Sequence, residues 1–476
     1  MQLRATPWVL LVVATMGCAT ASPRTPAPQP GAAAEGLAAK SAALAPDPFV
    51  STYAPLPSQT TLIRNATIMT AAGPTLHGAS ILLRDGKIAE IGTDIDAPSG
   101  AVVIDATGKW VTPGIIDTHS HLGVYPSPGV DALADGNEMT GPNTAEVWAE
   151  HSIWPQDPQF ALALAGGVTS MQILPGSANL FGGRGVTIKN VPARTVQAMK
   201  FPGAPHGLKM ACGENPSRVY GGRGRSPMTG MGNFAGYREA WIRAERYRDE
   251  WTRWAENGAD PARKPQRNLQ LETLAGVLDG EILVHHHCYR ADEMALVVDM
   301  AKEFGYKVSS FHHAVEAYKI RDILAREGIC ASMWADWWGF KMEAYDGILQ
   351  NAALVEEAGG CAIIHSDDAQ GIQRLNQETA KVLRAAREMG MEISDDAAIR
   401  WITINPAKAL GIDHVTGSLE PGKMADVVIW SGHPFSVYTR AEMVFIDGAL
   451  VYDRDDPALQ PKSDFMLGHD KRKVIS

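Results

Sequence analysis

A pair of histidines separated by one residue ends a short apolar run at residues 114–118. The pair is His119 and His121. Because side chains at positions i and i+2 of a strand point to the same side, these two imidazoles would converge from one short span. Divalent metal ions bind to convergent neutral ligands of this kind. The spacing predicts part of a metal site, but a His-x-His pair alone is equally compatible with two chance histidines on a surface loop.

Other apolar runs also end in residues that bind metals or move protons. A run at 282–284 precedes three histidines, one at 308–311 precedes two, and one at 362–364 precedes a histidine and two aspartates. In a barrel of parallel strands, the active site is assembled from the carboxyl ends of several strands. Chance no longer explains the pattern well. The residues at these ends are His285, His286, His287, His312, His313, His365, Asp367 and Asp368.

The region 113–411 alternates short apolar strands with helical patterns, which indicates repeated βα units around a parallel sheet. Nearly eight such units favour an α/β fold with a closed (β/α)8 TIM-type barrel over an open sheet. We expect strands at 114–118, 168–173, 208–211, 282–287, 308–313, 329–333 and 362–366. We expect helices at 157–165, 237–256, 291–304, 317–326, 347–358, 376–388 and 395–401.

Both flanks of the barrel segment are β-rich. Residues 61–112 contain short apolar runs punctuated by Asp85-Gly86, and a matching set at 412–455 is punctuated by Asp447-Gly448. Asp-Gly pairs between such runs are typical of tight turns. We expect the two flanks to pair into one small composite β-sandwich domain beside the barrel.

The first residues have the composition of an export signal. Arg4 precedes an apolar run at 8–14 that small residues follow, so 1–21 is predicted to be a signal peptide. Cys18 follows an imperfect lipoprotein box, which leaves a lipid anchor at this cysteine open. Residues 22–60 are rich in proline and alanine and are expected to form a loose tether. The protein would then be exported, either to the periplasm or as a membrane-anchored lipoprotein.

Together these motifs resemble the metal-dependent amidohydrolase superfamily, in its imidazolonepropionase-like and prolidase-like branch. The similarity extends over about residues 61–452 and includes Gly86-Lys87-Ile88, Thr112-Pro113-Gly114, the run 405–408 and the run 417–426. The resemblance implies a barrel flanked by a β-sandwich made from both chain ends. It also implies a divalent metal cofactor, with Zn²⁺ as the expected ion and one or two ions per chain.

The resemblance assigns roles to the strand-end residues. His119 and His121 match the pair that binds the more buried metal. Asp367 matches the aspartate that touches this metal and serves as proton acceptor and donor. His287 and His313 match the histidines that hold a second metal or complete the first site.

The neighbouring histidines have other interpretations. By strand alternation, His286 and His312 would point away from the site and pack or support the ligands. His285 would lie deeper in the barrel. His365 would face the site, as an outer contact to the metal or to the substrate.

The bridging ligand after the strand at 208–211 has two candidates. Glu214 is already anionic and is preferred, whereas Lys209 would first have to be carboxylated. Cys212 lies between them and could bind zinc, although a buried inert thiol is the commoner fate of an isolated cysteine. The five cysteines show no paired short spacing, so neither a zinc ribbon nor a dense disulfide framework is expected.

Substrate contacts are expected from loops after the strands. Glycine- and arginine-rich segments offer guanidinium groups that could clamp a carboxylate or could be ordinary surface arginines. A tryptophan cluster after the strand at 329–333 could line an apolar wall or pack beneath the rim of the barrel. The arginines are Arg184, Arg218, Arg223 and Arg225, and the tryptophans are Trp334, Trp337 and Trp338.

The predicted function is hydrolysis of a C–N bond in a small cyclic amide or dipeptide-like molecule. Metal binding would lower the pKa of a water toward roughly 7, and Asp367 would pass its proton to the leaving nitrogen. Alternatives are an Xaa-Pro dipeptidase, a deaminase and, in another class, a ligand-binding barrel without catalysis.

A formal charge of −10 without a basic run argues against nucleic acid as a partner. We expect a small-molecule substrate and a homo-oligomer.

Overall fold

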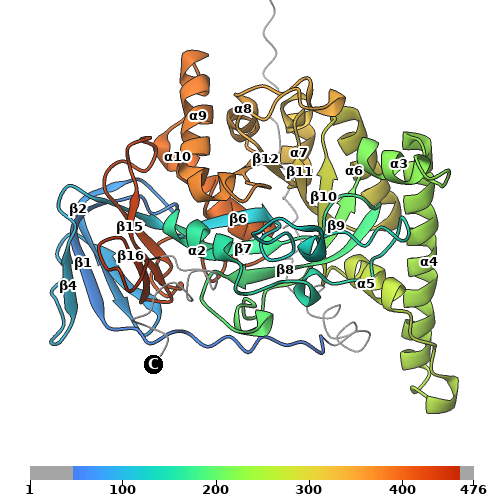
Figure 1. The fold of residues 1–476 in the computed structure, drawn as a ribbon, viewed down its shortest axis with the longest axis horizontal. Helices are drawn as coiled ribbons and strands as arrows, with labels where there is room; N and C mark the ends of the chain where they lie inside the picture. The colour runs from blue at the N-terminus through green and yellow to red at the C-terminus, as the bar shows by residue number, and fades with distance from the viewer. Residues whose placement is uncertain (1–46, 461–476) are drawn as a thin grey trace, which may run out of the picture.

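The computed structural model describes residues 47–460 (Figure 1). The predicted signal peptide at 1–21 and the candidate lipid-anchor residue Cys18 lie outside the described residues. The segment 47–60 runs extended along the lower edge of the molecule in Figure 1. Thr52 N donates to Gln197 O at 2.9 Å, and the Asp47 carboxylate lies 2.5 Å from Lys200 Nζ. Asp47 and Thr52 thus contact the barrel segment, within the stretch 22–60 that was predicted to be a loose tether.

Eight strands form the barrel sheet, in the spatial order β13-β12-β11-β10-β9-β8-β7-β6. Those at 168–173 and 308–313 have the predicted bounds, and five others differ by one or two residues at an end. The bounds are β6 Ile115–Ser120, β7 Val168–Ile173, β8 Phe181–Lys189, β9 Gly207–Ala211, β10 Leu283–Cys288, β11 Val308–His313, β12 Cys330–Met333 and β13 Cys361–Ile364. The central barrel predicted from the alternating pattern is confirmed.

Strand β8 was not predicted, and it runs antiparallel to both β7 and β9. We expected this Gly/Arg-rich segment to be a loop, but every residue in it is buried. A Cβ on Gly183 would lie 2.4 Å from Val147 O, and one on Gly185 would lie 2.5 Å from Leu174 Cδ2. The glycines therefore allow close packing rather than flexibility. At this strand the barrel departs from an all-parallel ring.

The first and last barrel strands meet at a seam. Backbone amides of β6 and β13 both donate to the segment 401–402, at 2.9 and 3.0 Å. Nearer the carboxyl ends of the strands, Asp367 N donates to His119 O at 3.0 Å. Two candidate site residues thus take part in closing the ring.

Helices pack around the barrel, with the long helix α4 at the edge farthest from the sheet domain (Figure 1). Helix α4 begins at Gly230, earlier than the predicted 237, and α8 begins at Asn351 rather than 347. The bounds are α2 Pro158–Ala165, α3 Glu214–Gly221, α4 Gly230–Glu256, α5 Leu269–Leu278, α6 Ala291–Phe304, α7 Arg321–Glu327, α8 Asn351–Glu357, α9 Leu375–Glu388, α10 Asp395–Arg400 and α11 Ile404–Ala409. Between residues 47 and 460, no helix combines the length and apolar character needed to cross a membrane.

The two flanks of the barrel segment form one mixed sheet, in the order β16-β15-β14-β5-β1-β2-β3, with β4 also paired to β1. The antiparallel pairing of β5 with β14 joins the two ends of the chain. Asp85-Gly86 and Asp447-Gly448 have positive φ at both positions, as a tight hairpin turn requires. The bounds are β1 Thr61–Ile68, β2 Leu76–Arg84, β3 Lys87–Gly92, β4 Val102–Asp105, β5 Trp110–Pro113, β14 Val427–Trp430, β15 Ala441–Ile446 and β16 Ala449–Asp453. Residues of both flanks share one hydrophobic core.

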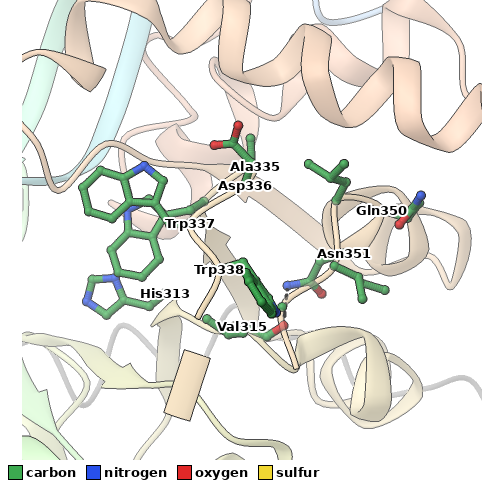
Figure 2. A pocket seen from close by; sticks show the side chains of 12 residues that line it. His313, Val315, Ala335, Asp336, Trp337, Trp338, Gln350 and Asn351 are labelled. Atoms are coloured by element: carbon green, nitrogen blue, oxygen red, sulfur yellow. Dashed lines mark hydrogen bonds between the residues drawn. The ribbon is translucent and has the colours of Figure 1, made fainter. Parts of the chain in front are cut away.

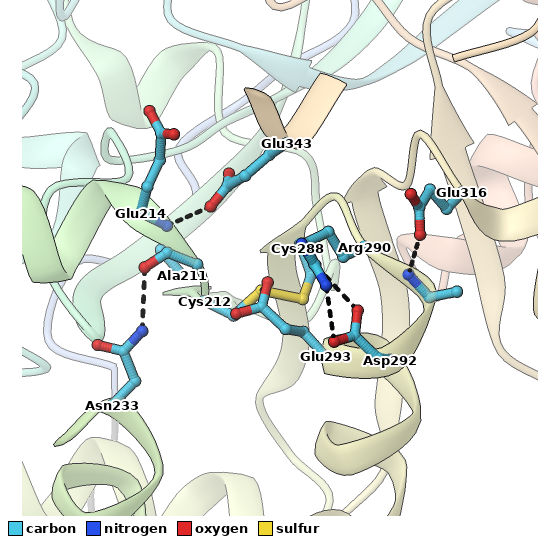
Figure 3. The surroundings of a disulfide bond; sticks show 12 residues. Ala211, Cys212, Glu214, Asn233, Cys288, Arg290, Asp292, Glu293, Glu316 and Glu343 are labelled. Atoms are coloured by element: carbon cyan, nitrogen blue, oxygen red, sulfur yellow. Dashed lines mark hydrogen bonds and ion pairs between the residues drawn. A yellow bond between two sulfur atoms is a disulfide. The ribbon is translucent and has the colours of Figure 1, made fainter. Parts of the chain in front are cut away.

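Two disulfides join adjacent barrel strands. Cys212, directly after β9, is bonded to Cys288 at the end of β10 (Figure 3), and Cys330 is bonded to Cys361 at the starts of β12 and β13. All four cysteines among residues 47–460 are therefore bonded. The interpretation of Cys212 as an isolated thiol or a zinc ligand is wrong, because strand neighbours, not sequence spacing, bring the sulfurs together.

Removing either disulfide is expected to lower the free energy of unfolding by about 2–4 kcal/mol. The Cys212–Cys288 bond closes a sequence separation of 76 and the Cys330–Cys361 bond one of 31. Replacing both cysteines of the first pair with serine should therefore cost about 1 kcal/mol more than replacing both of the second. Urea unfolding of the two double variants tests this order. Full thiol reactivity of the denatured, unreduced parent would contradict the pairing.

Candidate metal and catalytic site

Three ligand-type side chains converge at the carboxyl ends of β6 and β13. Asp367 Oδ1 lies 3.1 Å from His121 Nε2 and 3.3 Å from His119 Nε2. The two Nε2 atoms lie 3.3 Å apart. One donor atom from each residue lies within 4.8 Å of the other two, a spacing that can surround a single ion. The structure thus brings together the histidine pair and the aspartate that the sequence singled out.

Contacts at Nδ1, the ring nitrogen that faces away from Asp367, orient His119 and His121. His121 Nδ1 lies 2.8 Å from Leu174 O, so the neutral ring donates there and keeps its Nε2 lone pair for the cluster. His119 Nδ1 lies 2.9 Å from His312 Nδ1. Both rings therefore present Nε2 to Asp367.

His313 and His365 form a second group that shares His119. His313 Nδ1 lies 3.1 Å from His365 Nε2 and 3.8 Å from Asp367 Oδ2. One nitrogen each of His119, His313 and His365 again lies within 4.8 Å of the others. The His287 ring packs against His313, with 4.5 Å between ring centroids. The predicted histidine ligands are therefore neighbours, and His365 lies among them.

Strand alternation holds for His286. In β11 it also continues through the inward Ser310, the outward Phe311 and the inward His312, and it fails only at His313. His286 packs against aromatic rings on the helix side of the barrel. His312 points inward, and its ring nitrogens lie 2.9 Å from His119 and from His285. His313 also reaches the site because its φ of 69° at the end of β11 interrupts the regular alternation. The prediction that His312 points away is therefore wrong.

Strand β9 brings Lys209, rather than Glu214, to the cluster. Lys209 Nζ lies 3.1 Å from His119 Nε2, and its side chain is buried. Glu214 begins α3 after a turn at Gly213, where φ is 77°, and Figure 3 shows its carboxylate pointing away from the disulfide. That carboxylate is 31% exposed and lies 3.7 Å from Arg218. The geometry therefore reverses the preference for Glu214 as the bridging ligand.

Asp117 was missed in the sequence, although it precedes the histidine pair by two residues. Its carboxylate accepts hydrogen bonds from His119 N at 3.1 Å and Ser366 N at 3.2 Å, and also from Ser366 Oγ. Burial raises the pKa of Asp117 to about 7, against the effect of these hydrogen bonds. The residue joins β6 to the segment that carries Asp367. A lone acidic residue within a buried apolar strand was the available signal.

Burial favours the neutral form of the fully buried imidazoles in the cluster, such as His119 and His365. It holds the pKa of His119 well below its ordinary value and lowers the pKa of His365 to about 4. Neutral imidazole is the form that binds metals. Burial raises the pKa of Asp367, but hydrogen bonding and charge from His121 and the charge of Lys209 outweigh it, so the pKa lies below its ordinary value. Burial lowers the pKa of Lys209 to about 8.

The predicted arginines contact the protein itself. Arg184 lies on β8, and its Nε donates to Thr273 Oγ1 at 2.8 Å, so its placement in a loop was wrong. Arg223 donates to Met139 O at 2.6 Å, and Arg225 likewise donates to a backbone carbonyl. Arg218 is paired with Glu214. Their assignment to the substrate gains no support from these contacts.

The aromatic residues beside the cluster are held in place. Trp334 is buried, stacks on His313 with 4.2 Å between centroids, and donates from Nε1 to Ser366 O at 3.0 Å. It therefore packs beneath the rim, one of the two interpretations of the sequence. Lys341 Nζ lies 3.9 Å from the centroid of the Tyr289 ring. Lys341 and Tyr289 were not singled out in the sequence, because they become neighbours only in the fold.

A divalent cation fits this donor set. Imidazole nitrogens and a carboxylate oxygen are ligands that zinc and similar ions accept. Among the described residues, both ring nitrogens of His287 and the Nδ1 of His365 are buried without a hydrogen-bond partner. Buried polar atoms of this kind are costly unless a ligand satisfies them.

Comparison with known proteins agrees with this geometry. A family model described as "Amidohydrolase family" matches residues 279–457. The amidohydrolase tasK of Hapsidospora irregularis is 33% identical over 440 residues, which cover 84% of this chain and 44% of that protein. The chain thus spans less than half the length of this relative. The imidazolonepropionase of Shewanella frigidimarina is 24% identical over 396 residues, covering 78% of this chain and 89% of that protein.

A solved structure is similar over most of the chain. The crystal structure of an amidohydrolase from Thermotoga maritima MSB8 is 34% identical, with a TM-score of 0.76. The match covers 83% of this chain and 100% of that chain. The chain belongs to the amidohydrolase family.

Proposed function

We propose that the protein is a metal-dependent hydrolase of C–N bonds in a small cyclic amide or dipeptide-like molecule. One observation carries the proposal: His119 Nε2, His121 Nε2 and Asp367 Oδ1 converge within 3.3 Å of one another at the carboxyl ends of the barrel strands. Family membership supports this reaction class. The expected ion is Zn²⁺.

Residues of the barrel would bind the cation, transfer the proton and orient the ligands. A bound cation would polarise the scissile carbonyl and lower the pKa of the attacking water. The ionised Asp367 carboxylate would accept the proton that this water loses and return it to the leaving nitrogen, as amide cleavage requires. Leu174 and His312 would hold His121 and His119 in orientation through their far ring nitrogens.

We also propose that the protein is exported. Its two disulfides support this, because such bonds form and persist mainly in oxidising compartments. The export-signal composition of 1–21 points the same way. A lipid anchor at Cys18 and a homo-oligomeric state stay predictions. Fractionation of cells that make the full chain, with thiol counting in each fraction, separates exported from retained protein.

Metal removal is the direct test of the proposed reaction. Dialysis against dipicolinate is expected to abolish hydrolysis, and Zn²⁺ or Mn²⁺ added back should restore it, because the buried imidazoles would lose the ion they surround. The assay should compare cyclic amides with Xaa-Pro dipeptides and measure released ammonia. This distinguishes an amidase from a prolidase-like enzyme or a deaminase. Full activity without metal would contradict the proposal, and bound metal without turnover of any compound would favour a non-catalytic barrel.

A further inference from the structure

A cavity of about 450 Å³ lies directly beside the histidine cluster (Figure 2). It is lined by His313 and Val315 at the end of β11, by the segment 334–338 after β12 and by the segment 347–351 that leads into α8. Figure 2 shows His313 and Trp337 on one side and Gln350 and Asn351 on the other. A volume of this size is typical of small-molecule sites.

A stack of aromatic rings leads from the cluster into this cavity. Trp334 lies 4.2 Å from His313 between centroids at 25°, and Trp337 lies 4.8 Å from Trp334 at 15°. The hydrogen bond from Trp334 Nε1 to Ser366 O fixes the middle ring. The outer ring, Trp337, is therefore held in a defined orientation even though it is 40% exposed.

The cavity wall is mostly apolar, and two of its polar side chains, Asp336 and Asn351, already have partners. Trp338 is 59% exposed and Leu349 is 42% exposed, which is unusual for such large apolar side chains grouped together. The Asp336 carboxylate lies 2.8 Å from Lys381 Nζ. The Asn351 amide donates to two backbone carbonyl groups. A charged ligand would find no unpaired partner in these side chains, whereas a flat apolar group would find an indole surface.

We propose that this cavity binds a planar apolar substituent of the substrate, of phenyl or indole type; this rests on the proposed function above. The cavity adjoins the catalytic cluster at His313, which lines it and has its Nδ1 3.1 Å from His365 Nε2. A substrate whose C–N bond lies at the cluster would extend a substituent past His313 into this cavity. This position beside the cluster favours a substrate group over the surface of a second chain.

Matched probes with and without a benzyl group test the proposal. The pairs are hydantoin with 5-benzylhydantoin, and glycyl-L-proline with L-phenylalanyl-L-proline. Calorimetric titration of the metal-depleted full chain should show that the benzyl member of at least one pair binds about 10- to 100-fold more tightly, as expected for burying a phenyl group. Turnover of the same probes is measured separately with metal-loaded protein.

Tryptophan variants test whether the preference for benzyl probes arises in this cavity. Trp337→Ala and Trp338→Ala should each reduce the benzyl preference at least about threefold, and Trp337→Phe should retain most of it because a flat ring remains. Tyr438→Ala is the matched control, since Tyr438 is 89% exposed and lies in the sheet domain between β14 and β15. The control should keep the parental preference and the parental Tm.

The outcomes separate this inference from the proposed reaction. A benzyl preference that depends on the tryptophans supports the inference even if no probe is hydrolysed, in which case the proposed reaction fails for these substrates. Equal affinity within both pairs, or a preference unchanged in both tryptophan variants, overturns the inference. Hydrolysis of the unsubstituted and benzyl probes with equal kcat/KM would also overturn it. A change of oligomeric state in Trp338→Ala without a change in probe affinity would assign the surface to a second chain.

Discussion

Replacing Asp367 with asparagine is expected to lower kcat by about 10²- to 10⁴-fold, the usual contribution of a positioned general acid–base group. The amide has nearly the same shape but cannot take the proton of the attacking water. Asp367 Oδ1 lies 3.1 and 3.3 Å from Nε2 of the two histidines, and Oδ2 lies 3.8 Å from His313 Nδ1. The amide oxygen of asparagine can still occupy the Oδ1 position. The variant should therefore keep most of its metal, which elemental analysis measures beside the kinetic assay.

Asp368→Asn is the matched control for that variant. Asp368 is the next residue along the chain, but its carboxylate accepts hydrogen bonds from the backbone nitrogens of Gln370 and Gly371 instead of facing the cluster. We expect its kcat to remain within a few-fold of the parent. Parental turnover in Asp367→Asn, with metal bound in both proteins, would remove Asp367 from the proposed role.

The second large effect is expected at Lys209. Lys209→Met removes an amine that lies 3.1 Å from His119 Nε2 in a buried position. Loss of even an outer partner of a metal ligand costs about 10- to 100-fold in metal affinity or activity, so we expect at least that loss in both. Glu214→Gln should have a smaller effect, because its carboxylate is partly exposed and paired with Arg218.

Carboxylation of Lys209 can be examined in the same proteins. The neutral Nζ amine would form an N–C bond to the carbon of CO₂ and release one proton, which creates an anionic oxygen pair. Reconstitution of metal-depleted parent protein should then recover more activity with bicarbonate than in CO₂-free buffer, and Lys209→Met should show no such difference. A large loss in Glu214→Gln with a small loss in Lys209→Met would instead make the glutamate the bridging residue.

The fold was largely predictable because the residues that end its helices and strands form local sequence patterns. Val168–Ile173 and Val308–His313 each follow a helix that ends at a glycine, and the two Asp-Gly hairpins mark both halves of the composite sheet. Strand β8 was missed because glycine normally weakens a strand. Gly183 and Gly185 allow close contacts with Val147 and Leu174, which lie more than ten positions away, and no local pattern records that.

The site was predictable as far as strand ends determine it. His119, His121 and Asp367 follow apolar runs, so a barrel places them together. His313 was assigned to the site and His312 was placed outside it. The sequence could not show that His312 shares the inward side with Ser310, or that a positive φ brings His313 inward as well. Lys209 was ranked below Glu214 because the glutamate is already anionic. The sequence did not show that the turn at Gly213 places Glu214 at the start of α3, away from the cluster. The disulfides depend on which strands are neighbours, which the spacing of cysteines does not reveal.

The seam between β6 and β13 links the chemistry to the stability of the ring. Asp367 N donates to His119 O, and the Asp117 carboxylate accepts from Ser366 N, so the donor set exists only when the first and last strands are in register. A cation that binds this set binds only the closed ring, and its binding free energy is then added to the free energy of closure. At a free concentration one hundred times Kd this amounts to about 2.7 kcal/mol. Metal supply would therefore change the free energy of unfolding of the barrel as well as its turnover.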